Sequence, residues 1–320
     1  MNHLSIGTPL FYTVFFIIIF IMIAIDILAL KKNGSHKVNT KEALVWTVIW
    51  VIVSVCFAGW LYFELANDPN YGTQIAHEKV LEYFTGYVLE KSLAIDNIFV
   101  FLLIFSYFKV PSEWQHRVLI YGVFGAIILR AIMIGAGAVL VREFSEILYV
   151  FGAFLIYTGF KMLKPEAEHS DLGNNKLLKW VERRIRLTKE FHQERFFVKQ
   201  DGLLYATPLL LVLIMIELSD VIFAVDSIPA IFAVTTDPFI VLTSNIFAIL
   251  GLRAMYFLLA DVADRFEYLK YGLAIVLMFI GCKMLIVEWF HVPVILSLAV
   301  IFTVIGSSIA LSLFKTRSQS

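Results

Sequence analysis

Residues 217–230 read Glu217-Leu-Ser-Asp220-Val-Ile-Phe-Ala-Val-Asp226-Ser-Ile-Pro-Ala, with three carboxylates inside an apolar run that extends from about 205 to 233. A run of this length predicts a helix that crosses a lipid bilayer. A charged side chain in the middle of such a helix costs about 2.5–3.5 kcal/mol on insertion scales, so it must face the protein interior, a partner or a wet cavity. This stretch therefore predicts a membrane protein with a polar interior site.

The composition puts the rest of the chain in the same class. Of 320 residues, 60% are hydrophobic and 16% are charged, whereas soluble domains are about 45–50% apolar and about 25% charged. The 26 basic residues balance 26 acidic ones, which gives no support to a nucleic-acid partner. Two cysteines are too few for a disulfide scaffold. We therefore expect the lipid bilayer to be the main partner of the protein.

Nine long apolar runs predict an all-α, polytopic membrane protein with about nine transmembrane helices. A membrane β-barrel would instead show short segments of alternating polarity. The predicted spans cover residues 9–30, 43–65, 83–107, 117–141, 146–163, 205–233, 238–260, 268–287 and 293–314.

The basic residues predict the orientation, with the N-terminus outside and the C-terminus inside. In this topology the outer connections hold only Lys79 and Arg142, and the remaining loop and tail Lys and Arg lie inside. The long connection 164–204 is then cytoplasmic and has the pattern of an amphipathic surface helix. Its segment 195–205 predicts a β-hairpin around an Asp-Gly turn.

The charged signature occurs twice. Glu90-Lys-Ser-Leu-Ala-Ile-Asp96-Asn97 matches residues 220–227, with an acid, a second acid six residues later, and then a small polar residue. Two more pairs follow in the same order, and they are Phe124-Gly-Ala-Ile-Ile-Leu-Arg130-Ala with Phe247-Ala-Ile-Leu-Gly-Leu-Arg253-Ala, and Gly159-Phe-Lys161-Met-Leu with Gly281-Cys-Lys283-Met-Leu.

In the predicted topology these two three-helix units run in opposite directions. The sequence therefore predicts a 3+3 inverted-topology repeat, which is typical of secondary transporters with a site at the membrane midplane. The predicted parts are two N-terminal helices (1–66), the first repeat (81–163), the cytoplasmic loop (164–204), the second repeat (205–287), and a last helix with a cytoplasmic tail (288–320).

Spacing within each motif indicates which side chains meet. Asp220 and Ser227 are seven residues apart and share a helix face, as do the corresponding residues of the first motif. A straight helix cannot aim both acids of a motif at one point, so Pro229 predicts a local break in the sixth span. The candidate metal ligands are Glu90, Asp96, Glu217, Asp220 and Asp226, and the supporting residues are Asn97, Ser227, Lys91, Arg130 and Arg253.

An all-oxygen, anionic site suits a hard divalent cation such as manganese, magnesium or calcium. Zinc, copper and nickel sites usually contain His or Cys, and all seven His lie in connections or at span ends. Arg130 and Arg253 would partly balance the carboxylates when the cation is absent, and protons would replace it in the empty site. The alternative is that these charges only hold helices together. Whether Asp26 joins the site stays open.

The stretches beginning at Glu90, Glu217 and Phe247 resemble the TerC family of bacterial membrane proteins, and one branch of that family matches over nearly the whole chain. The resemblance implies a multi-pass protein of the bacterial inner membrane. The resemblance also implies an association with manganese export and, by the name of the family, with tellurium resistance. It further brings an older proposal that such proteins are membrane-bound redox modulators. It also implies that the family's metal-site acids fall on the five carboxylates above.

The sequence thus favours a secondary transporter that exports manganese(II) by alternating access, with no organic cofactor, no enzymatic activity and no P-loop. A redox protein would need a CxxC motif, a haem His pair or a flavin motif, and none is present. An intramembrane aspartyl protease would need a Gly-x-Gly-Asp context, which is also missing. The order of preference among manganese, calcium and magnesium and the oligomeric state stay open.

Overall fold

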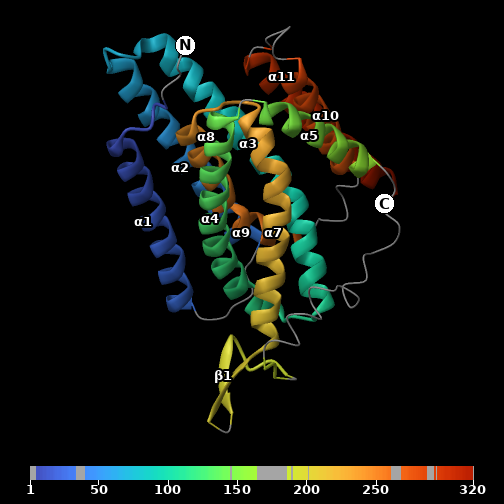
Figure 1. Ribbon diagram of the computed structural model, residues 1–320. Helices are drawn as coiled ribbons and strands as arrows, with labels where there is room; N and C mark the ends of the chain where they lie inside the picture. The colour runs from blue at the N-terminus through green and yellow to red at the C-terminus, as the bar shows by residue number, and fades with distance from the viewer. Residues whose placement is uncertain are drawn as a thin grey trace.

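The structure is a computed structural model. It describes residues 5–33, 40–144, 146–163, 186–188, 190–200, 202–260, 268–286, 292 and 294–319. The fold is a helical bundle with one small β-hairpin at one end (Figure 1). Its elements are α1 (Pro9–Asn33), α2 (Thr40–Asn67), α3 (Gly72–Tyr107), α4 (Ser112–Glu143), α5 (Ile147–Leu163), β1 (Phe197–Gln200), β2 (Leu203–Ala206), α7 (Pro208–Phe232), α8 (Pro238–Leu250), α9 (Leu252–Ala260), α10 (Leu269–Leu285) and α11 (Val294–Gln319).

Each of the nine predicted spans contains a helix, and the span 238–260 contains two, α8 and α9. Within the described residues, α2, α4, α7 and α11 are long and apolar enough to cross a bilayer, and the α8–α9 pair, bent by 40°, makes a fifth candidate. Helix α3 has 36 residues, but every 18-residue stretch of it carries at least three charged side chains. The protein is therefore a helical membrane protein, and the full number of spans and their orientation stay predictions.

Helices of each predicted half pack against helices of the other half. Helix α3 of the first half lies against α8 of the second, and α7 of the second half lies against α4 of the first (Figure 1). Helices α5 and α10 form the most extensive pair in the described structure. The helices that carry the acidic motifs, α3 and α7, are thus held by partners from the opposite half.

The α5–α10 contact depends on glycines. A Cβ on Gly281 would lie 2.6 Å from the carbonyl oxygen of Gly152, and one on Gly159 would lie 2.7 Å from that of Ala274. Small residues allow backbones in membrane helices to approach this closely. Gly159 matches Gly281 in the sequence, and Gly152 then falls opposite Ala274, so exchanging the halves exchanges the two contacts. This is the relation expected of the predicted repeat.

The sequence predicted a helix break at Pro229 and a β-hairpin at 195–205, and only the hairpin is present. The expected break at Pro229 is wrong, because α7 continues through it to Phe232. Pro229 lies in the last turn of α7, where little helix follows that its missing N–H could disturb. The bend instead falls at Gly251, between α8 and α9.

The predicted hairpin is confirmed. Strands β1 and β2 pair antiparallel from Phe197–Ala206 to Gln200–Leu203, and Gly202 has a positive φ of 76°. A two-residue turn of this kind needs φ above zero, which glycine adopts without strain. The hairpin lies at the end of the bundle where α7 begins (Figure 1). The predicted amphipathic helix of the loop 164–204 lies outside the described residues.

Candidate functional site

Arg130 of α4 lies at the centre of a buried polar cluster between the two halves. Its Nε donates to Asp220 Oδ2 at 3.0 Å and its Nη2 to Asp220 Oδ1 at 2.9 Å, a bidentate pair with α7. Its Nη1 donates to Glu90 Oε1 on α3. All three residues are at most 2% exposed. The planar guanidinium presents its donors in a fixed fork, so it fixes both carboxylates at once.

Two neutral side chains complete the surroundings of the guanidinium. Arg130 Nη1 is 3.3 Å from Ser227 Oγ and 3.5 Å from Asn245 Oδ1. The structure therefore places Asp220 and Ser227 on the same face of α7, as their spacing predicted. Asn245, on α8 and fully buried, was not among the predicted site residues. A lone amide within an apolar run was the only available signal for it.

The cluster has unused hydrogen-bonding capacity. In the described part of the structure, Glu90 Oε2 and Asn245 Nδ2 are buried without a hydrogen-bond partner. Leaving such a group unsatisfied costs about 1–3 kcal/mol. Two carboxylates also share one guanidinium. The site thus has more acidic than basic side chains and an unpartnered carboxylate oxygen, and oxygen atoms of this kind are the ligands that a hard cation prefers.

Glu217 lies one turn before Asp220 on α7 but outside the hydrogen bonds of Arg130. Its carboxylate packs directly against Gly125 of α4, where a Cβ would overlap its oxygens. Its Oε2 is buried and has no hydrogen-bond partner among the described residues. A small cavity nearby is lined by Asp220, Arg253 and Gly122, among others. Glu217 is therefore close to the cluster without being held by it.

Lys91 does not pair with the neighbouring Glu90. Its Nζ donates to the carbonyl oxygen of Ala248 at 3.0 Å and lies 5.9 Å from the centre of the Tyr87 ring. Ala248 is in the last turn of α8, whose carbonyls lose their helical partners at the bend. Gly251 leaves room for the ammonium, because a Cβ there would overlap it. Lys91 thus stabilises the α8–α9 break.

The two arginines predicted as equivalents have different contacts. Arg130 bonds to the carboxylates, whereas Arg253 of α9 donates from Nη1 to Nε2 of His116 at 3.2 Å. Arg253 is 4% exposed. It therefore joins α9 to the first turns of α4, and it also lines the cavity beside Asp220.

The remaining predicted residues are placed only in part. Asn97 is buried on α3, and the side chains of Asp26, Asp96 and Asp226 lie outside the described part of the structure. No group of three or more His, Cys, Asp or Glu side chains within the described residues is arranged to hold a metal ion. The complete five-carboxylate site therefore stays a prediction.

Comparison with known proteins identifies the family. The profile described as "Integral membrane protein TerC family" matches residues 75–320. The chain belongs to this family of integral membrane proteins, as its motifs predicted.

Curated relatives narrow the relationship to the Alx branch, the one that the motifs had singled out. The protein named "Putative membrane-bound redox modulator Alx" from Salmonella typhi is 53% identical over 308 residues, 96% of this chain and 95% of its own. The protein of the same name from Escherichia coli K12 is 54% identical over 301 residues, covering 94% and 93%. An uncharacterized membrane protein of Myxococcus xanthus is 44% identical over 313 residues, covering 98% and 95%. No solved structure matches the chain.

Proposed function

We propose that this protein is a secondary transporter that exports a divalent cation, manganese, across the bacterial inner membrane by alternating access. Its cation ligands are Glu90, Asp96, Glu217, Asp220 and Asp226. The observation that carries the proposal is the meeting of Glu90 and Asp220 at one buried guanidinium, because these acids occupy corresponding positions in the two halves.

Arg130 acts in this proposal as a tethered cation. It neutralises part of the charge of the two carboxylates while no metal is bound, and a divalent ion displaces it by offering higher charge to the same oxygens. Without such a counter-charge, two buried carboxylates this close would repel each other strongly. The oxygen-only ligands suit manganese, magnesium and calcium, and the family resemblance favours manganese among them.

The packing of the helices supports movement of one half against the other. Helices α3 and α7 each lie against a helix of the opposite half. A site formed at such an interface opens to either side when the halves rock, which is the usual behaviour of inverted repeats.

Carboxylate-to-amide variants test the proposal in cells. Asp96→Asn and Asp226→Asn should raise intracellular manganese and sensitise cells to it, although the protein still inserts. The matched control is Glu78→Gln, an exposed carboxylate on α3, which should behave like the parent. If both site variants also behave like the parent, the assignment of these acids is wrong.

A redox role is the second candidate, and the names of the Alx relatives favour it. The chain offers two free cysteines, Cys56 on α2 and Cys282 on α10, and both are exposed. If thiol chemistry were the function, the double variant Cys56→Ser/Cys282→Ser would lose every phenotype of the protein. Manganese export that survives in this variant would separate the two candidates.

A further inference from the structure

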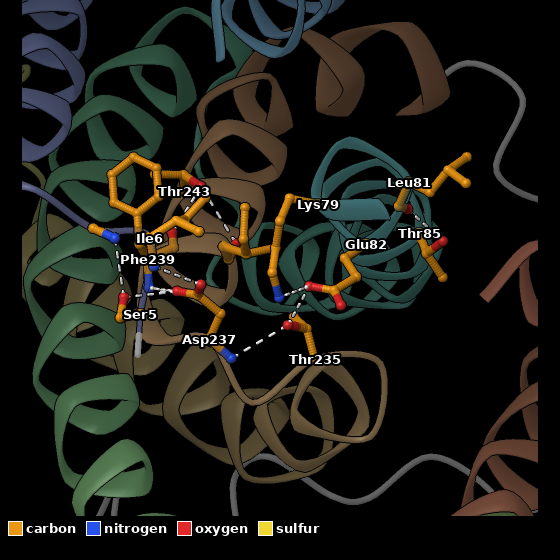
Figure 2. A network of polar contacts seen from close by, with 12 residues as sticks. Ser5, Ile6, Lys79, Leu81, Glu82, Thr85, Thr235, Asp237, Phe239 and Thr243 are labelled. Atoms are coloured by element: carbon orange, nitrogen blue, oxygen red, sulfur yellow. Dashed lines mark hydrogen bonds and ion pairs between the residues drawn. The ribbon is translucent and has the colours of Figure 1, made fainter. Parts of the chain in front are cut away.

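A second polar network joins three segments at the end of the bundle away from the hairpin. It consists of Ser5, Lys79, Glu82, Thr235 and Asp237, and we call it the polar clasp (Figure 2). Ser5 precedes α1, Lys79 and Glu82 lie in the first turns of α3, and the other two residues lie in the turn between α7 and α8. The clasp therefore connects the N-terminal segment and both predicted halves.

Asp237 does more than cap α8. Its Oδ1 accepts from Phe239 N at 3.0 Å, which is an ordinary N-cap bond. The same oxygen accepts from Ser5 Oγ at 2.8 Å, and Oδ2 accepts from Ile6 N at 2.9 Å. One cap needs a single acceptor, so the second carboxylate oxygen serves only to hold the N-terminal segment.

Thr235 extends the network to the first half. Its hydroxyl donates to Glu82 Oε2 at 2.6 Å and accepts from Asp237 N at 3.2 Å. Lys79 Nζ lies 2.8 Å from the same Glu82 oxygen. Glu82 and Asp237 are each 7% exposed. Thr235 and Asp237 lie in the turn between α7 and α8, and Glu82 lies three turns into α3. The bonds of the clasp therefore join separate segments and must break when those segments move apart.

The clasp lies directly above the candidate site along α3. Glu82, Gly86 and Glu90 occupy successive turns of this helix. At the middle level, α8 approaches so closely that a Cβ on Gly86 would lie 2.8 Å from Ser244 Oγ. For a path to run between α3 and α8 from Glu90 to this end of the bundle, the two helices must therefore separate at Gly86, and the clasp must then open.

We propose that the polar clasp holds this end of the transport pathway shut, with Asp237 and Thr235 as the positioning residues whose hydrogen bonds break when it opens. In the predicted orientation this is the extracytoplasmic exit. Ser5 and Ile6 lie before the stretch 75–320 that the family profile covers, so in this proposal the N-terminal segment acts as a latch on the part of the chain that the profile matches. The inference rests on the proposed transport function.

Labelling of a buried cysteine tests the clasp without measuring transport. In the full chain with Cys56 and Cys282 replaced by serine, Ser244→Cys places a thiol at a position that is fully buried in the closed state. A membrane-impermeant maleimide is added from the side of the N-terminus. Asp237→Asn keeps the N-cap but sets an amide N–H₂ against Ile6 N–H, and Thr235→Val removes the bond to Glu82 at equal size.

Each of these two variants should raise the labelling rate at least tenfold over the reporter protein alone. The control Asp68→Asn, in the α2–α3 turn, should leave it unchanged. A second reporter, Leu155→Cys on α5, is also fully buried and should stay unlabelled.

Rates within twofold of the reporter protein in both variants would overturn the proposal. So would a parallel rise at Leu155→Cys, because that result means general loosening. If labelling responds as expected while the parent protein moves no manganese, the clasp stands and the proposed cargo is wrong.

Discussion

Replacing Arg130 with leucine should make the stability of the candidate site depend on a bound metal ion, because it removes the guanidinium that two carboxylates share. The change removes five donor–acceptor contacts, four of them to Asp220, Glu90 and Ser227. It leaves two carboxylates, at 1% and 2% exposure, without their counter-charge. Breaking a buried pair by removing one partner costs about 3–5 kcal/mol, so we expect a loss of that order in the free energy of unfolding.

A divalent cation should restore much of this loss if the cluster is its site. A ligand present at 100 times its Kd stabilises a protein by about 2.7 kcal/mol. Thermal unfolding of the purified protein, titrated with manganese, measures the effect. The charge-balanced double variant Arg130→Leu/Asp220→Asn is the control, since it removes one ligand together with the guanidinium. It should unfold closer to the parent without metal and gain little from manganese.

Two results would refute this reasoning. One is an Arg130→Leu protein that is as stable as the parent in the presence of a chelator. The other is equal stabilisation of the single and double variants by manganese, which would place the ion elsewhere. Either result would leave Arg130 as a structural residue between helices rather than a substitute for the transported cation.

Three other variants have sharp expectations. Gly125→Ala should abolish transport, because its methyl group overlaps the carboxylate of Glu217, and a combined Glu217→Asp should recover part of the flux in the same vesicles. Gly281→Ala should lower the unfolding temperature by forcing α5 and α10 apart, whereas Gly59→Ala, with no atom within 4 Å of its added Cβ, should leave it unchanged or slightly raised. Asn245→Leu should raise the apparent KM for manganese by about tenfold while expression is maintained, and an unchanged KM would remove Asn245 from the site.

The positions of the helices were predictable because apolar runs near twenty residues have few alternatives in a membrane protein. The central contact was partly predictable as well. Asp220 and Ser227 share a face by spacing alone, and the matching acid of the first half, Glu90, had to find a partner in the interior. Helical periodicity and the cost of buried charge suffice for these conclusions.

Other features depend on tertiary packing that the sequence does not display. Lys91 was predicted as a supporting residue of the metal site, but its long side chain reaches the carbonyl oxygen of Ala248 beside the bend at Gly251. A break was instead expected at Pro229, in the sixth predicted span, since a proline interrupts a helix locally. In the last turn of α7, however, little helix remains to be interrupted. The sequence around Gly251 gave no comparable indication of a bend.

The contacts of Asn245 and Asp237 illustrate the same limit. A single amide in an apolar run and an acid before a proline are ordinary features of helices and caps. Their roles come from residues more than 100 positions away in the chain, Arg130 for one and Ser5 for the other. Spacing arguments operate within one element and cannot detect such pairs.

Manganese flux into proteoliposomes that contain only the purified protein tests the central claim most directly. The account predicts time-dependent uptake that exceeds that of protein-free vesicles and is abolished by Asp220→Asn, while Glu78→Gln behaves like the parent. Uptake no faster than in protein-free vesicles, or equal uptake by the parent and Asp220→Asn, would contradict it.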